Sequence, residues 1–178
     1  MLEAVLKSPD SPTQAEFHEV IASRASRWYS ACLRITRDQD LAEDAVQDAL
    51  LSAWNKRHQF DRGSRLDTWI HRIAINAALQ LLRKKKPQAW EPLEEDIPDD
   101  TLLPDVARAE QELNSELVAA LHQLSDVERV CFVLKHLEQW RLKEIAEELD
   151  TNIGTIKQAL FRALKKLRIS MASLRSEA

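Results

Sequence analysis

Apolar residues recur with a helical spacing in three stretches of the first half of the chain. The stretches cover residues 15–35, 40–56 and 68–85. A return every three or four residues places the apolar side chains along one side of an α-helix and leaves the other side polar. Asp67-Thr68 is a typical helix start, and the lysines 84–86 before Pro87 are a typical stop. The apolar series are Phe17, Val20, Ile21, Trp28, Cys32 and Ile35; then Leu41, Ala45, Val46, Ala49, Leu50, Ala53 and Trp54; then Trp69, Ile70, Ile73, Ala74, Ala77, Leu81 and Leu82.

A second pattern, near the C-terminus, is typical of a helix-turn-helix. Residues 142–149 predict one helix, and a second begins near Thr155 and runs past Leu167. Ala146 is small enough to let the two helices cross closely. Asp150 stands where such motifs usually carry glycine, and aspartate tolerates the left-handed backbone conformation better than most residues.

The composition predicts an all-α fold. The chain has 178 residues but only two glycines, whereas all-β folds depend on glycine-rich turns. No apolar run approaches the length of a transmembrane helix, and the N-terminal segment lacks an export signal, so we expect no membrane insertion. Cys32 and Cys131 fit core thiols in a reducing cytoplasm, and a redox-sensing role is the open alternative.

Charge divides the chain into two helical domains and a linker. Residues 87–107 hold seven acids, no Lys or Arg, and four of the six prolines, so no helix can run through them. We expect domains at 1–86 and 112–178, joined by an acidic, proline-rich linker at 87–111; a long acidic loop inside one domain is the alternative. Residues 151–178 carry six Lys or Arg and one acid, a local basic region that suits nucleic acid.

Three helix faces carry candidate binding chemistry. The helix at 40–56 has an acidic outer stripe with an outward leucine, which suits a basic protein partner with an apolar pocket, although a merely solvated face is the alternative. The helix at 68–85 and the loop before it present arginines and Asn76, which suit opened DNA; Trp69 is either a stacking group or a core residue. The last helix presents Lys157, Lys165 and Lys166 for phosphates in a major groove, with a membrane-surface or calmodulin-binding helix as the alternative.

These segments together resemble a known family. Residues 40–54 (DLAEDAVQDALLSAW), Phe60-Asp61 and 68–76 (TWIHRIAIN) resemble region 2 of the extracytoplasmic-function (ECF, group 4) sigma factors of RNA polymerase. Residues 120–125 (ALHQLS), 144–149 (EIAEEL) and 154–157 (GTIK) resemble region 4 of the same family. The resemblance covers roughly residues 15–170, and it places two separate motif blocks in the family's order.

The resemblance implies partners and roles. Region 2 of the family binds the β′ clamp helices of core polymerase and recognises the melted −10 element, whereas region 4 binds the β flap and reads the −35 element as duplex. Relatives are often held by an anti-sigma factor, so we expect such an inhibitor here. The implied core-polymerase contacts are Glu43, Asp44, Gln47, Asp48 and Leu51; the −10 contacts are Ser64, Arg65, Arg72 and Asn76; the −35 contacts are Thr155, Lys157, Gln158, Phe161, Arg162 and Lys165.

Two departures from the family pattern bear on promoter choice. Gln158-Ala159 replaces a Ser-Arg pair, which removes one arginine and predicts an unusual or weaker −35 preference. Gln139-Trp140-Arg141 replaces a Gly-Leu-Ser entry, which removes the serine cap and leaves Trp140 as a candidate protein contact.

Two other classes of protein are alternatives to a sigma factor. An autonomous helix-turn-helix repressor would bind a palindrome as a homodimer without polymerase. An enzyme is not expected, because the five histidines form no HExxH or paired i, i+4 arrangement and the chain has no glycine-rich phosphate loop. No cofactor, metal site or catalytic residue is predicted.

Overall fold

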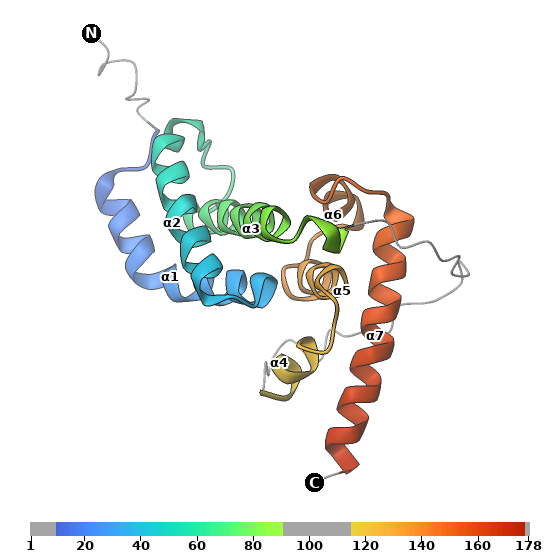
Figure 1. Cartoon of the computed structure of the whole chain (residues 1–178). Coiled ribbons are helices and arrows are strands. Elements are labelled where there is room, and N and C mark those ends of the chain that lie inside the picture. The colour runs from blue at the N-terminus through green and yellow to red at the C-terminus, as the bar shows by residue number, and fades with distance from the viewer. Residues whose placement is uncertain (1–9, 91–114, 177–178) are drawn as a thin grey trace. The chain divides into compact units, whose positions relative to one another are not determined.

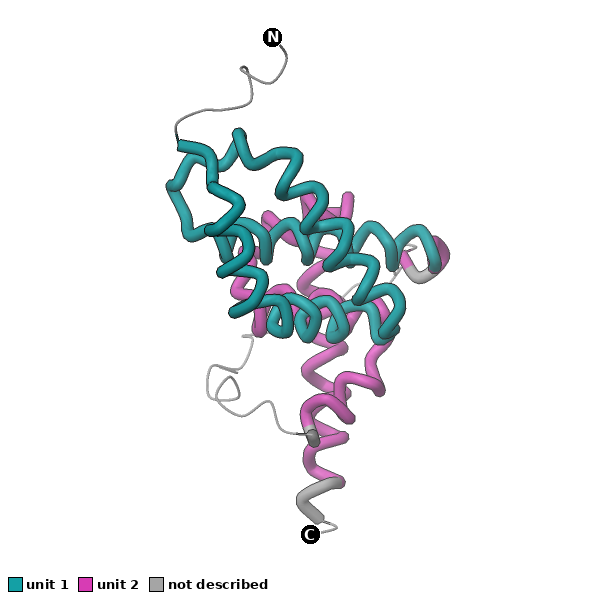
Figure 2. The backbone as a smooth tube through the Cα atoms, turned by 90° about the vertical axis from the view of Figure 1, so that its left-hand side faces the viewer, with its two compact units in different colours: residues 1–85 teal, residues 86–178 magenta. Residues whose placement is uncertain are grey.

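The computed structural model describes residues 10–90 and 115–176, and within these ranges every regular element is helical. Figure 1 shows the helices in chain order. The chain divides into two compact units, Met1–Lys85 and Lys86–Ala178, which Figure 2 draws in different colours. The all-α prediction is therefore confirmed. Most of the predicted linker, from residue 91 onward, lies outside the described residues, whereas Pro87–Trp90 forms the short 3₁₀ turn η3.

The first unit is a bundle of three helices that pack against one another. These are α1 (Gln14–Thr36), α2 (Gln39–Asn55) and α3 (Leu66–Lys85), with the 3₁₀ turn η2 (Arg57–Gln59) after α2. The predicted helices are reproduced to within two residues at each end. The first two begin at side-chain caps: Thr13 forms a capping box with Glu16, and Asp38 Oδ1 accepts a hydrogen bond from the Leu41 amide at 3.1 Å.

The core of this bundle is built on alanines from α2. Four alanines spaced three or four residues apart are buried, and they let α1 and α3 approach closely. The larger residues predicted for the α2 core lie at its rim instead: Leu41, Val46 and Leu50 are half-buried, and Trp54 is 36% exposed. The buried residues are Ala42, Ala45, Ala49 and Ala53 of α2, with Trp28, Ala31, Cys32 and Ile35 of α1 and Ile70, Ala74, Ile75, Ala78, Leu79 and Leu82 of α3.

In the second unit, a long C-terminal helix packs against three shorter ones. These are α4 (Ser115–Leu121), α5 (Asp126–Phe132) and α6 (Leu142–Glu148), and α7 (Ile153–Ser176) packs against each of them. A π-helical turn, η5 (Val133–Leu137), continues α5. Helices α6 and α7 form the predicted helix-turn-helix, but α7 begins two residues earlier than expected. The reason is that Asn152 caps it, accepting a 2.9 Å hydrogen bond from the Thr155 amide.

The turn between α6 and α7 has the predicted left-handed residue. Asp150 has φ 51°, its amide donates to the Glu147 carbonyl at 3.3 Å, and the Thr151 amide donates to the Ala146 carbonyl at 2.9 Å. This pair of hydrogen bonds is a Schellman motif, which satisfies the last carbonyls of α6. Aspartate thus occupies the position that glycine usually fills.

The Trp140 prediction needs correction. This side chain was a candidate protein contact, but only 4% of it is exposed. Its amide donates to the Leu134 carbonyl at 2.9 Å, which ties the residue to the π-helical turn. The departure at residues 139–141 thus buries an aromatic side chain. No N-cap side chain replaces the serine, but Glu144 accepts from the Arg141 amide at 2.8 Å, the reciprocal half of a capping box.

Candidate functional site

The outer face of α2 carries the acidic stripe, defined as Glu43, Asp44, Gln47, Asp48 and Leu51. All five side chains are exposed, and Leu51 is 65% exposed, the arrangement that the spacing predicted. The alanines on the opposite side of the helix fix this orientation because they face the bundle core. A leucine held in water beside acids can bury its side chain only against another molecule, so the stripe is suited to a partner with a basic, partly apolar surface.

The loop before α3 is tightly shaped. Phe60 is buried, and its ring lies 5.3 Å from the ring of half-buried Trp69, so Trp69 anchors the loop to the bundle. The Gly63 amide donates to Asp61 Oδ1 at 2.8 Å. Arg62, not the glycine beside it, adopts the left-handed conformation, with φ 59°.

Ser64 and Arg65 lie at the exposed end of this loop. Arg65 Nε donates to Asp67 Oδ1 at 3.1 Å, while Arg24 Nε lies 3.3 Å from Asp67 Oδ2. Asp67 lies in the first turn of α3, where a negative charge also favours the helix dipole. The carboxylate therefore holds two arginines in place at the start of the helix.

Arg72 and Asn76 lie on α3 as half-buried residues rather than fully exposed ones. Asn76 lines a pocket of about 310 Å³ between α2 and α3, and its Oδ1 is buried without a hydrogen-bond partner in the described part of the chain. A buried acceptor without a partner is unfavourable. Asp48 of the acidic stripe also lines this pocket. The pocket therefore lies between a predicted −10 residue, Asn76, and a predicted polymerase contact.

The basic run at 84–86 is partly engaged within the fold. Lys85 donates to Asp38 Oδ2, and this hydrogen bond raises the pKa of Lys85 and lowers that of Asp38. Lys86 Nζ lies 3.3 Å from Asp126 Oδ2 on α5. Two of the three lysines that the sequence placed beside the −10 helix thus have carboxylate partners, which reduces their contribution to a nucleic-acid surface.

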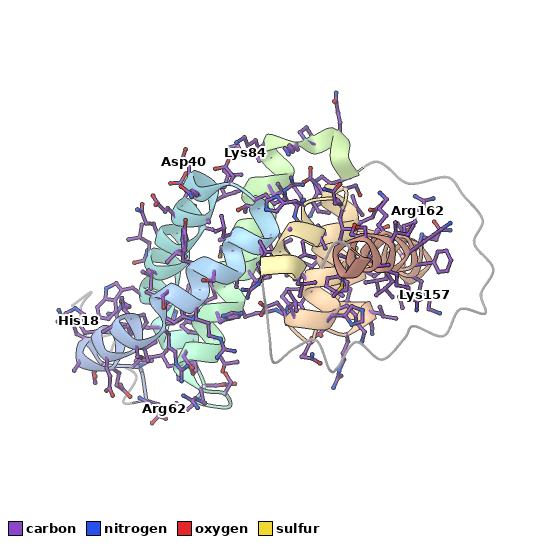
Figure 3. The ribbon with its side chains drawn as sticks, turned by 90° about the horizontal axis from the view of Figure 1, so that it is seen from below. His18, Asp40, Arg62, Lys84, Lys157 and Arg162 are labelled. Carbon is purple, nitrogen blue, oxygen red and sulfur yellow. The ribbon has the colours of Figure 1, made fainter. Side chains whose placement is uncertain are left out.

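The outward face of α7 gathers the predicted −35 residues. Lys157 and Lys165 are exposed, and Figure 3 shows Lys157 and Arg162 extending away from the helix. Gln158, Phe161 and Arg162 are half-buried. Thr155 donates its hydroxyl hydrogen to Asn152 Oδ1 at 3.2 Å, so this hydroxyl helps to shape the start of the helix. The face combines cations, an amide and an aromatic ring, the groups that contact phosphates and base edges in a major groove.

Ala159 and Lys166 change the interpretation of this face. Ala159 is fully buried on the apolar side of α7. The arginine that the family carries at this position would therefore start from the core side of the helix, and its absence takes no residue from the outward face. Lys166 was a predicted phosphate contact, but its Nζ bonds both carboxylate oxygens of Glu128 at 2.8 and 2.9 Å.

The thiols are buried, as predicted. Cys32 Sγ lies 3.5 Å from the Ala74 carbonyl oxygen, and burial raises the pKa of Cys131 to about 12. Within residues 10–90 and 115–176, no group of three or more His, Cys, Asp or Glu side chains is placed to hold a metal ion. No helix in the described part of the chain is both long and apolar enough to span a membrane.

Some residues that shape these surfaces were not identified from the sequence. Arg62 and Glu128 find their partners 46 and 38 residues away, respectively, and no local pattern signals such pairs. The Thr13–Glu16 capping box and the Asn152 cap do have local signatures, a small polar residue three positions before its partner.

An acidic, leucine-bearing face in one helical unit and a cationic helix-turn-helix in another are surfaces suited to a protein that binds both a protein partner and DNA. Comparison with known families identifies the family to which this chain belongs. The family model for sigma-70 region 2 matches residues 20–88, and that for sigma-70 region 4 matches residues 114–167. The chain belongs to the sigma-70 family of RNA polymerase sigma factors, in its extracytoplasmic-function group.

Individual relatives agree along nearly the whole chain. The ECF RNA polymerase sigma factor SigW of Bacillus subtilis is 28% identical over 98% of both chains. The RNA polymerase sigma factor CarQ of Myxococcus xanthus is 30% identical over 92% of this chain and 94% of CarQ. Among solved structures, the sigma factor RpoE of Bartonella quintana in complex with the anti-sigma factor NepR is 25% identical, with a TM-score of 0.56, covering 88% of this chain and 97% of RpoE.

Proposed function

We propose that this chain is a dissociable sigma factor that brings core RNA polymerase to specific promoters. The observation that carries the proposal is that separate region 2 and region 4 units each present a distinct surface, the acidic stripe on α2 and the cationic face of α7. The acidic stripe would bind core polymerase, with Leu51 inserted into an apolar pocket of the β′ clamp helices. Acids around the leucine would exclude acidic partners and select a basic one.

The DNA contacts follow from the other two surfaces. Ser64, Arg65, Arg72 and Asn76 would bind the melted −10 strand, to which arginines offer phosphate and stacking contacts. The α7 face would enter the major groove at the −35 element, with Gln158 and Arg162 reading base edges and Lys157 and Lys165 contacting phosphates. Asn76 would act through its Nδ2 donor, because its Oδ1 is buried.

We also propose that a separate anti-sigma factor holds this chain in the cytoplasm until a signal releases it. RpoE of Bartonella quintana was solved with the anti-sigma factor NepR, and the structure of CnrH, 21% identical, contains the cytosolic domain of CnrY. A similar inhibitor would cover the exposed Leu51 and the α7 face, which otherwise remain open to polymerase and DNA. Pull-down from unstressed cells tests this: recovery of the chain free or only with polymerase would contradict it.

Co-elution with core polymerase on size exclusion tests the main proposal. Wild type should elute with polymerase, whereas Asp44→Arg/Asp48→Arg should stay free because two repulsive charges replace two attractive ones. Glu19→Arg, which reverses an exposed acid on α1, is the control for charge and should co-elute. If wild type elutes alone as a dimer, the autonomous repressor becomes the better explanation; if the double variant co-elutes, another surface binds polymerase.

A further inference from the structure

Arg62 ties the loop before α3 to the N-terminal end of α1. Its Nε donates to the Asp10 carbonyl at 3.0 Å, and its Nη1 and Nη2 donate to Glu16 Oε1 and Oε2 at 3.1 and 3.4 Å. One side chain thus makes three hydrogen bonds to a segment 46 to 52 residues away. A two-pronged arginine–carboxylate pair fixes direction as well as distance. Figure 3 labels Arg62 in this loop.

Glu16 is itself held in position. Its Oε2 accepts from the Thr13 amide at 2.7 Å, while its own amide donates to Thr13 Oγ1 at 3.2 Å. The hydrogen bond from Arg62, and then that from the Thr13 amide, lower the pKa of Glu16. The carboxylate therefore stays charged and oriented at neutral pH, and Arg62 binds a fixed point at the start of α1.

The backbone at Arg62 shows why the loop needs such a contact. A φ of 59° is uncommon for a residue with a side chain, and it persists where the surroundings enforce it. The neighbouring glycine, which would adopt this conformation readily, does not do so. The three hydrogen bonds of the Arg62 side chain help to offset this unfavourable backbone, together with the hydrogen bond from the Gly63 amide to Asp61 Oδ1.

The loop held in this way carries two of the candidate −10 contacts. Ser64 and Arg65 line an open depression of about 430 Å³ between the loop and α1, together with Arg62 and Glu16. A shift of the loop relative to α1 would change the shape of this depression and move both −10 candidates. Arg62 stands two residues before Ser64, close enough in the chain to set its position.

We propose that Arg62, through Glu16, is a positioning residue that holds the −10 loop in its binding shape. This inference rests on the proposed function. An exposed ion pair contributes little to global stability, so removing it should alter the loop and leave the bundle folded. The effect should appear in recognition of the melted −10 strand and not in binding of core polymerase, whose candidate surface lies on α2.

The test uses holoenzyme made from core polymerase and the full chain. The probe is a forked DNA whose −10 strand has been selected from a randomised pool by wild-type holoenzyme. Affinities are measured by fluorescence anisotropy for wild type, Glu16→Gln, Arg62→Gly and the double variant. Arg62→Gly keeps the left-handed backbone favourable and removes the whole side chain, including the guanidinium that bonds Glu16. Core affinity and melting temperature are measured for every variant.

We expect each single variant to bind the fork three- to tenfold more weakly, with core affinity unchanged. The double variant should be no weaker than the weaker-binding single variant, because both changes break one interaction. Glu16→Gln gives the sharpest result, since it removes a negative charge near DNA and frees Arg62. If Arg62 instead contacts DNA directly, this variant binds the fork as tightly as wild type or more tightly, and the proposal is wrong.

Other outcomes separate the two proposals. Additive losses in the double variant would mean that Glu16 and Arg62 act independently, and unchanged fork binding in all three variants would mean that the pair has no positioning role; both overturn the inference. Failure of wild type to bind core polymerase would instead refute the proposed function. A fall in core affinity that matches the loss of fork affinity would show a general defect of the unit, which also contradicts a local role.

Discussion

Lys166 Nζ bridges the two carboxylate oxygens of Glu128, at 2.9 Å from Oε1 and 2.8 Å from Oε2. Glu128 has only 5% of its side chain exposed, so Lys166 is its compensating charge. Lys165, the preceding residue on α7, is exposed to solvent. Two adjacent lysines thus have different tasks: one stabilises the unit and the other is available to a phosphate.

This difference predicts distinct salt dependences. Lys165→Gln should lower the slope of log affinity against log salt by about 1 for holoenzyme binding to −35 duplex, because one phosphate contact is lost. Lys166→Gln should leave this slope unchanged and lower the free energy of unfolding by about 1–2 kcal/mol, because Glu128 loses a charged hydrogen bond. Salt titrations and urea denaturation measure the two effects. An equal slope change for both variants would show that Lys166 leaves Glu128 when DNA binds.

Asn76 should show a conflict between stability and function. Asn76→Ala removes a buried acceptor that has no partner and places a better helix former in α3, so the free energy of unfolding should stay the same or rise by up to about 1 kcal/mol. Fork binding should weaken, because a −10 contact is lost. Thermal melting measures the change in stability, and fluorescence anisotropy measures the change in fork binding. Clear destabilisation would mean that Oδ1 has a stabilising role in the pocket between α2 and α3.

The local stability of α6 should depend on which side chain occupies position 150, the left-handed residue of the helix-turn-helix. Asp150→Gly should slow hydrogen exchange of α6 amides, by a stabilisation of about 0.5–1 kcal/mol, because glycine adopts φ near 51° without steric cost. Asp150→Ala should not slow the exchange, since alanine keeps the steric cost of the left-handed conformation that glycine lacks. Equal exchange in both variants would indicate that the turn does not limit local opening.

Acid should weaken the second unit through Asp126. Burial by itself would raise the pKa of Asp126, but hydrogen bonds from Arg129 at 2.7 Å and Lys86 at 3.3 Å outweigh it, and the pKa lies below its ordinary value. A carboxyl with a lowered pKa in the folded state stabilises fully above its ordinary pKa, and this contribution is lost as the pH falls below about 4. Urea denaturation at pH 7 and pH 3 should therefore show that the free energy of unfolding falls less between the two pH values for Asp126→Asn than for wild type. An equal loss in both would assign acid sensitivity to other carboxyls.

Helical spacing accounted for much of the fold, although it misplaced some large side chains. Residues 15–35 and 40–56 were predicted as helices, and α1 and α2 begin and end within one residue of those limits. The period places the exposed stripe of α2 correctly because orientation about a helix axis follows from spacing alone. It did not place Trp54 or Trp140, since burial depends on what packs opposite. The apolar series contained three of the four buried α2 alanines but could not show that they exclude Trp54 from the core, and the π-helical turn before Trp140 was not anticipated.

What the sequence determined by itself was local: the helices, the outward leucine and acids of α2, the cationic face of α7 and the left-handed Asp150. Each follows from the period of the chain or from the conformational preference of one residue. The tertiary structure alone decided which charges are available to a partner. Lys166, Lys85 and Arg62 are bound to carboxylates 38 to 47 residues away. Such pairs form only after helices distant in the chain have packed, because a charge finds its partner by position in space and not by position in sequence.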